Sequence, residues 1–251
     1  LTKVVATAPA VMMLVEDGAL RLQDPVARYI PGFERHGKGT ITVEHLLTHM
    51  SGLRPDFPLE EEFQGYQRAI ARAIEEQPVH AAGTQFVYSD INFIVLAEIV
   101  ARTSGMPFDE FVERRLLLPL RMTDTGFLPS PDKRVRVAPT ESCRPFGWPC
   151  GDEGSVMLRG VVHDPTARRM GGVAGHAGLF GTADDLARYG AMLLAHGVLD
   201  EAHVLSPLSV ARMTRPATTF GIGEQRGLGW DISSRYSSNR GDLFSTRSYG
   251  H

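Results

Sequence analysis

Cysteine and lysine are scarce in this sequence, and their scarcity narrows the chemistry available to it. Cys143 and Cys150 are the only cysteines, which excludes a disulfide framework and a four-cysteine metal site. They form either a disulfide that closes the turn between them, in an oxidising compartment, or two separate thiols. Lysine occurs only at positions 3, 38 and 133, so any lysine chemistry must use one of these side chains.

Long hydrophobic runs and an excess of one charge are also missing. No stretch of about 20 apolar residues occurs, so we expect no transmembrane segment in this sequence. The 26 basic and 29 acidic residues leave a net charge of −3, which gives no electrostatic reason to expect a nucleic acid as partner. A chain of 251 residues is long enough for one large domain.

Helical patterns dominate what is present. Apolar spacing predicts a helix over residues 2–17 with a kink at Pro9. Thr42 can cap a short helix that runs through His49, and Gly52 is placed to end it in a left-handed conformation. The remaining segments are predicted as helices over 59–76, 89–103 and 182–195, short helices after Pro107 and after Ser206, and loops with a few short strands over 123–175.

The first candidate for chemistry is Lys3, at the start of the amphipathic run that leads to Gly18. Residues three apart on a helical turn share a face. Leu1-Thr2-Lys3 can therefore be the end of an S-x-x-K motif whose serine directly precedes Leu1. A buried, deprotonated lysine amine can take the proton of such a serine as it attacks. The alternative is an ordinary lysine near the start of a chain.

A literal S-x-x-K occurs at Ser130 to Lys133, preceded by Pro129 and interrupted by Pro131. The two prolines favour a turn over a helix start, so we interpret this match as a coincidence. The sequence then contains no nucleophile for this chemistry, and the 251 residues by themselves are expected to be inactive.

A second candidate is Tyr88, in Tyr88-Ser89-Asp90. A tyrosine where a loop meets a helix can present its phenol into a cleft, where nearby cations favour the phenolate as a general base. The alternative is a tyrosine packed at the start of the helix. Ser89 or Asp90 can cap that helix, and Asn92 follows within its first turn.

The third candidate is His251. The final residues Ser248-Tyr249-Gly250-His251 look like the opening of a [KH]-T-G strand, of which only the basic residue is present. Taken alone, a terminal histidine would carry no functional meaning.

For the other histidines, a structural role is an alternative to a functional one. His45 and His49 are four residues apart, a spacing that suits zinc, but the glutamate of H-E-x-x-H is missing. We therefore favour core or loop-anchoring histidines. His176, flanked by glycines, could line a cleft or hold a loop. His163-Asp164 indicates a turn with a local hydrogen bond.

Together these motifs resemble those of the serine β-lactamase and penicillin-binding-protein family. The order is the same: a lysine motif, Y-x-[ND] about 85 residues later, then a basic residue of [KH]-T-G. Two runs between them are more specific. His45 to Leu53 is similar to H-L-L-T-H-T-S-G-L of the class C and esterase branch, with Met50 replacing threonine. Gly171 to Phe180 is similar to G-G-V-A-G-H-A-G-L-F of β-lactamase-related bacterial hydrolases.

The resemblance covers essentially the whole chain and implies a role for each matching residue. Lys3 would be the general base or proton shuttle beside the serine nucleophile. Tyr88 would be the second acid/base, which protonates the leaving group or activates water. His251 would help to polarise the site and bind a substrate carboxylate.

Asp90, Asn92 and His176 are the candidate substrate-binding residues. Asp90 stands where class C β-lactamases have asparagine. An asparagine can donate a hydrogen bond to a substrate amide, whereas an ionised aspartate can only accept. This departure counts against β-lactam hydrolysis more than against serine chemistry in general.

The implied fold is an α/β (α+β) β-lactamase/transpeptidase-like fold, with an all-helical lobe beside an antiparallel sheet. We expect residues 1–251 to be a partial domain, truncated at both ends, that holds mainly the helical lobe. Most of the sheet and both oxyanion-hole amides would lie outside it. No metal and no cofactor are implied. A signal peptide would also lie outside, and a periplasmic or secreted location is expected for the parent protein.

The expected function is that of a serine hydrolase that acts through an acyl-enzyme on a D-alanyl peptide, an ester or a β-lactam. Its partner would be a small-molecule or peptidoglycan-peptide substrate. The alternative is a non-catalytic module on the same fold that binds peptidoglycan or a protein partner. A serine directly before Leu1 in the parent gene would favour the enzyme; alanine or glycine there would favour the binding module.

Overall fold

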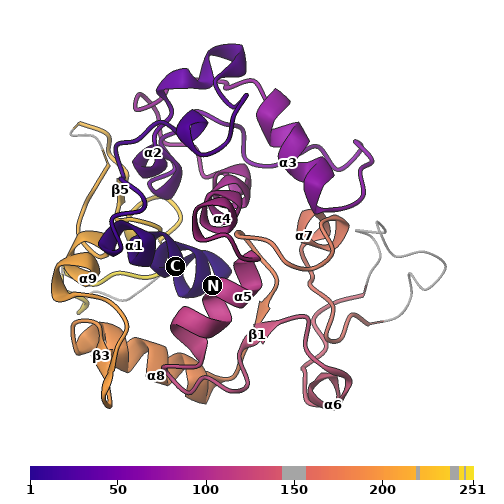
Figure 1. Ribbon diagram of the computed structural model, residues 1–251, viewed down its shortest axis with the longest axis vertical. Helices are drawn as coiled ribbons and strands as arrows, with labels where there is room; N and C mark the ends of the chain where they lie inside the picture. Colours follow the sequence, from indigo (N-terminus) through magenta and orange to yellow (C-terminus); the bar gives the residue numbers. More distant parts are fainter. Residues whose placement is uncertain (143–156, 219–220, 238–242, 246) are drawn as a thin grey trace.

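The computed structural model describes residues 1–142, 157–218, 221–237, 243–245 and 247–251. Helix α4 (Asp90–Ser104) lies at the centre of the molecule (Figure 1). Residues 91–100 of this helix are all buried. Because the helix is apolar on nearly every face, no face is stabilised by contact with water. Ser89 precedes the helix but does not cap it as predicted, because its hydroxyl donates to the carbonyl of Arg54 at 2.6 Å. Gly105 ends the helix with a φ of 73°, as the sequence predicted.

The other helices lie around α4 (Figure 1), and several of them contact it directly. They are α1 (Ala8–Glu16), α2 (Val43–Leu47), α3 (Tyr66–Glu75), α5 (Phe108–Val112), α6 (Pro131–Arg134), α7 (Pro165–Arg169), α8 (Ala183–Leu194) and α9 (Pro207–Met213), with 3-10 turns η2 (Val26–Arg28) and η3 (Arg35–Thr40) and π-helical turns η1 (Lys3–Thr7) and η4 (Glu113–Leu117).

The described strands form three antiparallel pairs and no larger sheet. They are β1 (Gly126–Phe127) with β2 (Leu179–Phe180), β3 (Val198–Leu199) with β4 (Ala202–His203), and β5 (Gln225–Arg226) with β6 (Asp231–Ser233). Gly126 pairs with Phe180 and Val198 with His203. The helix-rich composition predicted from the sequence is therefore confirmed for the described residues.

The predicted N-terminal helix is present, but its irregularity differs from a simple kink. The π-helical turn η1 leads directly into α1, with Pro9 in the first turn of α1. Proline has no backbone N–H to return to the preceding turn, and a wider turn before it accommodates the missing hydrogen bond. Thr7 is buried there and donates a hydrogen bond to the carbonyl of Gly175 at 2.6 Å.

The predicted helix over 59–76 is wrong in its first part, since α3 begins only at Tyr66. The guanidinium of Arg169 donates to the carbonyls of Leu59 at 2.6 Å and Glu61 at 2.8 Å. Because a distant arginine binds these carbonyls, they need no helical partner, and residues 58–61 form a turn closed by a hydrogen bond from Glu61 to Pro58.

The short helix capped by Thr42 also ends earlier than predicted, at Leu47. The left-handed residue that follows it is His49, with a φ of 59°. Gly52 does have a positive φ of 78°, but for another reason: a Cβ there would lie 2.0 Å from the carbonyl oxygen of His80. Glycine is required because two backbone segments touch at this point.

The segment over 123–175 contains two short helices that the sequence did not predict, α6 and α7. The expectation of a turn at Ser130 to Lys133 is wrong, because Pro131 opens α6. Proline suits the first turn of a helix, where its missing N–H would have no partner. Cys143 and Cys150 lie outside the described residues.

Side-chain caps begin the last two helices, which start where the sequence predicted. The hydroxyl of Thr182 accepts a hydrogen bond from the backbone of Asp185 at the start of α8, and Ser206 does the same for Ser209 at the start of α9. A short polar side chain at this position binds an otherwise unpaired N–H.

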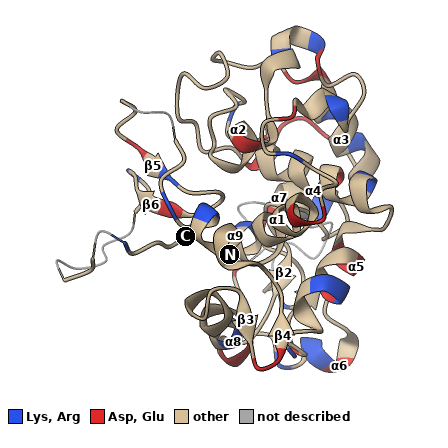
Figure 2. Ribbon diagram, turned by 60° about the vertical axis from the view of Figure 1, so that its left-hand side comes forward, with Lys and Arg blue, Asp and Glu red and all other residues tan. Residues whose placement is uncertain are grey.

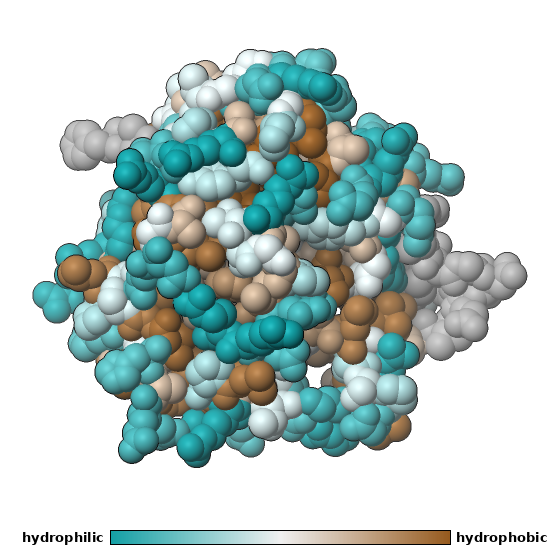
Figure 3. Space-filling model, in the orientation of Figure 1, coloured by the Kyte–Doolittle hydropathy of each residue, from teal (hydrophilic) through white to brown (hydrophobic). Residues whose placement is uncertain are grey.

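The surface is mixed in charge and polarity. Basic and acidic residues are interspersed over the outer helices in the view of Figure 2, as the small net charge of −3 suggests. Hydrophilic side chains cover much of the face in Figure 3, with apolar ones between them. Among the described residues, no single helix has the length and apolarity to cross a membrane. Helix α4 and the α5–η4 segment together reach that length and apolarity, but they are bent by 76° relative to each other.

Candidate active site

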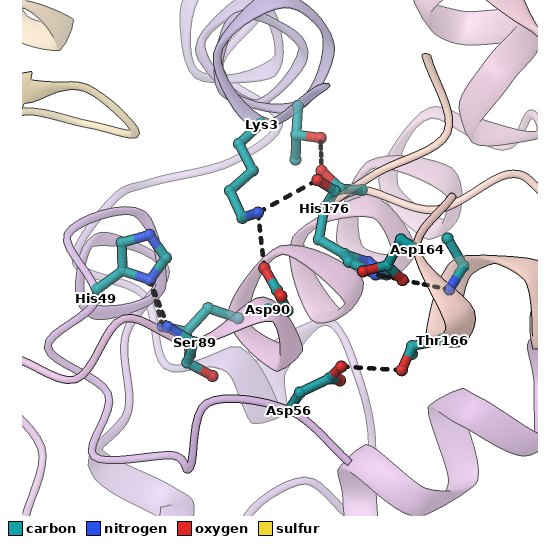
Figure 4. Close-up of polar contacts among 12 residues, drawn as sticks. Lys3, His49, Asp56, Ser89, Asp90, Asp164, Thr166 and His176 are labelled. Carbon is teal, nitrogen blue, oxygen red and sulfur yellow. Dashed lines mark hydrogen bonds and ion pairs between the residues drawn. The ribbon is translucent and has the colours of Figure 1, made fainter. Parts of the chain in front are cut away.

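Lys3 and Asp90 form an ion pair where the N-terminal helix meets α4. The Lys3 ammonium lies 2.6 Å from Oδ1 of Asp90 and donates to the backbone carbonyl of His176 at 3.2 Å (Figure 4). Lys3 is 6% exposed. The π-helical turn that contains Lys3 and the first turn of α4 are both packed in the core, so the partners are held by rigid elements.

The pair keeps Lys3 charged. Burial alone would lower the pKa of Lys3, but the charges and hydrogen bonds of Asp90 and Tyr88 outweigh it and raise this pKa above the usual value. The expectation of a deprotonated amine is therefore corrected, because in this structure the ammonium form is favoured. A lysine that acts as a general base would first have to lose this proton.

Tyr88 lies beside this cation. The Lys3 ammonium is 5.2 Å from the centre of the Tyr88 ring, which itself stacks on His49 with a centroid distance of 4.4 Å. The His251 ring lies 6.5 Å from the Tyr88 ring. The structure thus brings together Lys3, Tyr88 and His251, which are far apart in the sequence.

His251 reaches Tyr88 because the end of the chain pairs with β6. Gly250 and Asp231 exchange backbone hydrogen bonds of 2.9 and 2.8 Å in an antiparallel bridge. Desolvation is the main cause that lowers the pKa of His251, and the nearby cations Lys3 and Arg226 lower it further. The two ends of the chain lie next to each other in Figures 1 and 2.

A second ion pair adjoins the first. The buried imidazole of His176 lies 2.9 Å from Oδ1 of Asp164, and Asp164 also caps α7 by accepting from the backbone of Ala167. Burial would raise the pKa of Asp164, but the charge and hydrogen bond of His176 lower it to about 2. In place of the turn predicted at His163-Asp164, the structure has a bend at His163 and the N-cap of α7 at Asp164, and the local hydrogen bond is the one from Ala167.

Asp56 is a site residue that sequence reasoning missed. Its carboxylate oxygen lies within 4.8 Å of carboxylate oxygens of Asp90 and Asp164, and Thr166 donates a hydrogen bond to it at 2.9 Å. The residue stands in a loop after the H-L-L-T-H run, where no sequence spacing links it to α4 or α7. Its place is set by the tertiary structure alone.

Arg226 was missed as well. This buried arginine of β5 lies 5.7 Å from the centre of the Tyr88 ring and 3.3 Å from the carboxylate of Asp231. Arginine is too common in this sequence to single one out. The arrangement places a second cation near Tyr88, on the side of the C-terminal strands.

Asn92 lies away from these charges. It is fully buried, where its side-chain oxygen accepts from the hydroxyl of Ser51 at 2.6 Å and its nitrogen lies 3.3 Å from Nδ1 of His49. Asn92 therefore anchors the 45–53 segment in this structure. Its predicted contact with substrate would require these bonds to break.

His45 and His49 serve separate structural roles, in line with the loop-anchoring interpretation. Nδ1 of His45 accepts from the backbone of Thr42 and completes the cap of α2. Nδ1 of His49 accepts from the backbone of Ser89 at 3.0 Å. Burial, followed by nearby cations, lowers the pKa of His49 well below its usual value, so this imidazole is neutral.

The literal S-x-x-K lies apart from this site. Lys133 lies in α6 and pairs at 3.8 Å with Asp124, which precedes β1. Within the described ranges, Ser130 and Lys133 are not among the residues that Lys3 and Tyr88 contact. The interpretation of this match as a coincidence agrees with that position.

The Gly175 loop offers a test of how tightly His176 is held. A Cβ at Gly175 would lie 2.0 Å from the carbonyl oxygen of Phe93 and 2.8 Å from the Cβ of Ala97. We expect Gly175→Ala to reduce the free energy of unfolding by about 1–3 kcal/mol, as overpacking does. Chemical denaturation measures this, and Gly190→Ala in α8, where nothing lies within 4 Å, is the control that should not destabilise. An unchanged Gly175→Ala protein would contradict the close packing.

Comparison with known proteins shows the family to which the chain is related. The Beta-lactamase family model matches residues 1–251. A protein of Escherichia coli (strain K12) named "Putative D-alanyl-D-alanine carboxypeptidase" is 31% identical over 277 residues, covering 100% of this chain and 62% of that protein. A protein of the same name from Salmonella typhimurium is 30% identical over 274 residues, with the same shares covered. The chain thus spans about 62% of the length of these relatives.

Solved structures agree on the fold. A penicillin-binding protein homologue from Caulobacter crescentus has a TM-score of 0.73 at 20% identity, covering 100% of this chain and 69% of the other. A class C β-lactamase has a TM-score of 0.70 at 22% identity, with 92% and 58% covered. The octameric penicillin-binding protein homologue from Pyrococcus abyssi has a TM-score of 0.68 at 24% identity, with 92% and 52% covered. The predicted β-lactamase/transpeptidase fold is confirmed, and the chain belongs to the β-lactamase family.

Proposed function

We propose that the protein containing this chain is a serine hydrolase, which forms an acyl-enzyme on a serine directly before Leu1. The observation that carries the proposal is the convergence of Lys3, Tyr88 and His251 at one place, beside Leu1. A serine there would stand one helical turn before Lys3 and beside the Tyr88 ring. This is the arrangement of a nucleophile with its base in reach.

The charges of the site favour Tyr88 as the group that moves the proton. Lys3 is held as a cation by Asp90, and a fixed cation stabilises negative charge that develops on a neighbouring phenol. Tyr88 would enter this step as the phenolate, after its own proton has passed to solvent. The phenolate would take the serine proton as the serine attacks, and the resulting phenol would give that proton to the leaving group. Lys3 would act as the electrostatic partner of this transfer.

Asp90 bears on the choice of substrate. Its carboxylate is bound to Lys3 and can donate no hydrogen bond to a substrate amide. We therefore propose a D-alanyl peptide or an ester as the substrate, in preference to a β-lactam. Relatives about 31% identical carry a carboxypeptidase name, which supports the peptide.

A panel of three substrates tests the proposal in the gene product that extends beyond Leu1 and His251. It consists of a peptide ending in D-Ala-D-Ala, a p-nitrophenyl ester and nitrocefin. We expect turnover of the peptide or the ester that exceeds turnover of nitrocefin. Binding of the peptide without hydrolysis of any of the three would instead support a non-catalytic peptidoglycan-binding module.

A further inference from the structure

A group of three carboxylates and two cations lies beneath the site, and we call it the charge cluster. Its members are Asp56, Asp90, Asp164, Lys3 and His176 (Figure 4). The carboxylate oxygens lie within 4.8 Å of one another. The cations are buried, with side-chain exposures of 8% for Lys3 and 1% for His176, and the carboxylates are partly exposed.

The charges of the cluster do not balance when every member is ionised. Lys3 neutralises Asp90, and the imidazolium of His176 neutralises Asp164. Asp56 remains: within the described part of the chain it forms no ion pair, and its carboxylate accepts only from the hydroxyl of Thr166 at 2.9 Å and the backbone of Phe57 at 2.7 Å. One negative charge is therefore left over.

Carboxylates this close, away from bulk water, do not all stay ionised, because repulsion and burial favour a retained proton on one of them. Asp56 is the member without a cation, so it is the one that keeps the proton. Burial, together with the charges of Asp164 and Asp90, raises the pKa of Asp56 to about 6, against the opposing effect of His176. The groups that face Asp56 are Asp90 from α4, Asp164, Thr166 and the more distant Arg169 from α7, and His176 from the loop before β2.

We propose that Asp56 is a positioning residue for Lys3, which acts through Asp90 by holding or releasing the proton that balances the charge cluster. With the proton on Asp56, the cluster is neutral and Asp90 is bound by Lys3 alone. When Asp56 loses it, the added negative charge holds the protons of Lys3 and His176 more firmly. The proposal rests on the proposed function in one respect: it assumes that Lys3 takes part in acyl transfer.

The proton on Asp56 also has a predictable effect on stability. Folded Asp56 binds its proton more tightly than unfolded aspartate, whose pKa is 3.8. Its contribution is therefore complete below pH 3.8 and is lost as the pH rises through about 6. Asp56→Asn removes this dependence, because an amide does not titrate.

The test is an NMR titration of the His176 imidazole and the Lys3 side-chain amine in the 251-residue chain. In the wild type we expect both signals to shift in a step near pH 6 as Asp56 ionises, and Asp56→Asn should remove this step. A wild type with no step in either signal, or an Asp56→Asn protein that keeps it, would overturn the proposal.

Two further variants keep the test decisive if Asp56→Asn folds poorly. Thr166→Val removes the hydroxyl that binds the ionised form of Asp56, so the step should move to higher pH; a step that does not move counts against the proposal. Asp185→Asn is the matched control, since Asp185 is a buried carboxylate that binds Thr125 and lies outside the cluster. It should leave the step in place.

The titration needs no substrate, so its outcome is separate from that of the substrate panel. Loss of the step in Asp56→Asn, together with no hydrolysis by the extended gene product, would reject the proposed function and keep the charge coupling. Hydrolysis by the extended product, with a step that Asp56→Asn leaves unchanged, would reject the role of Asp56 and keep the function.

Discussion

Asp90→Asn is expected to lower the pKa of Lys3 below its usual value and to destabilise the fold. The carboxylate 2.6 Å from the Lys3 ammonium is the main group that offsets burial of this cation. Breaking a buried pair by removing one partner costs about 3–5 kcal/mol, and we expect the lower end because Asp90 is 23% exposed. NMR titration of the Lys3 amine and denaturation at neutral pH measure the two effects.

The pH dependence of this loss has a definite sign. In the wild type, the raised pKa of Lys3 means that its proton stabilises the fold fully below pH 10.5 while Asp90 is ionised, and that this contribution is lost as the pH rises through the raised pKa. In Asp90→Asn, the lowered pKa reverses the slope, so the deficit in stability should shrink as the pH rises toward the point where Lys3 is neutral. A deficit that is constant with pH would mean that Asp90 acts by packing and not by charge.

Tyr88→Phe is expected to lower kcat by about 10²–10⁴ in the gene product that carries a serine before Leu1, since a positioned acid/base group contributes that much. The phenyl ring keeps the stacking on His49 at 4.4 Å, so stability should change little. Steady-state kinetics with the substrate that turns over in the panel measure the loss.

Tyr236→Phe is the matched control for this variant. The Tyr236 ring lies 5.1 Å from that of Tyr88 but is 56% exposed, and no proton transfer is assigned to its hydroxyl. It should retain near wild-type kcat. If Tyr88→Phe also retained it, Tyr88 would be a packing residue at the start of α4, the alternative that the sequence left open.

Local signals explain which parts of the fold could be predicted. Thr42, Thr182 and Ser206 cap the helices that follow them, because a cap depends on residues within one turn of the chain. The start of α3 could not be predicted, since Arg169, about a hundred residues away, binds the carbonyls of Leu59 and Glu61. Helix propensity cannot account for a competing partner that only folding supplies.

The site residues also divide into those that the sequence predicted and those that it did not. Lys3, Tyr88 and His251 stood in motifs, and the structure brings them together. Asp56 and Arg226 stood in none, and they reach the site through loops and strands whose paths are set by long-range packing. The charge state of Lys3 could not be predicted from the sequence either, because it depends on whether Asp90 faces the Lys3 amine or caps helix α4.

Covalent labelling tests the central claim most directly. The extended gene product is treated with a fluorophosphonate or a penicillin, and the modified residue is mapped by mass spectrometry. The account predicts one adduct, on a serine directly before Leu1, that is greatly reduced in Tyr88→Phe and retained in Tyr236→Phe. A folded protein with a serine at that position and no adduct, or an adduct on Ser130, would contradict it.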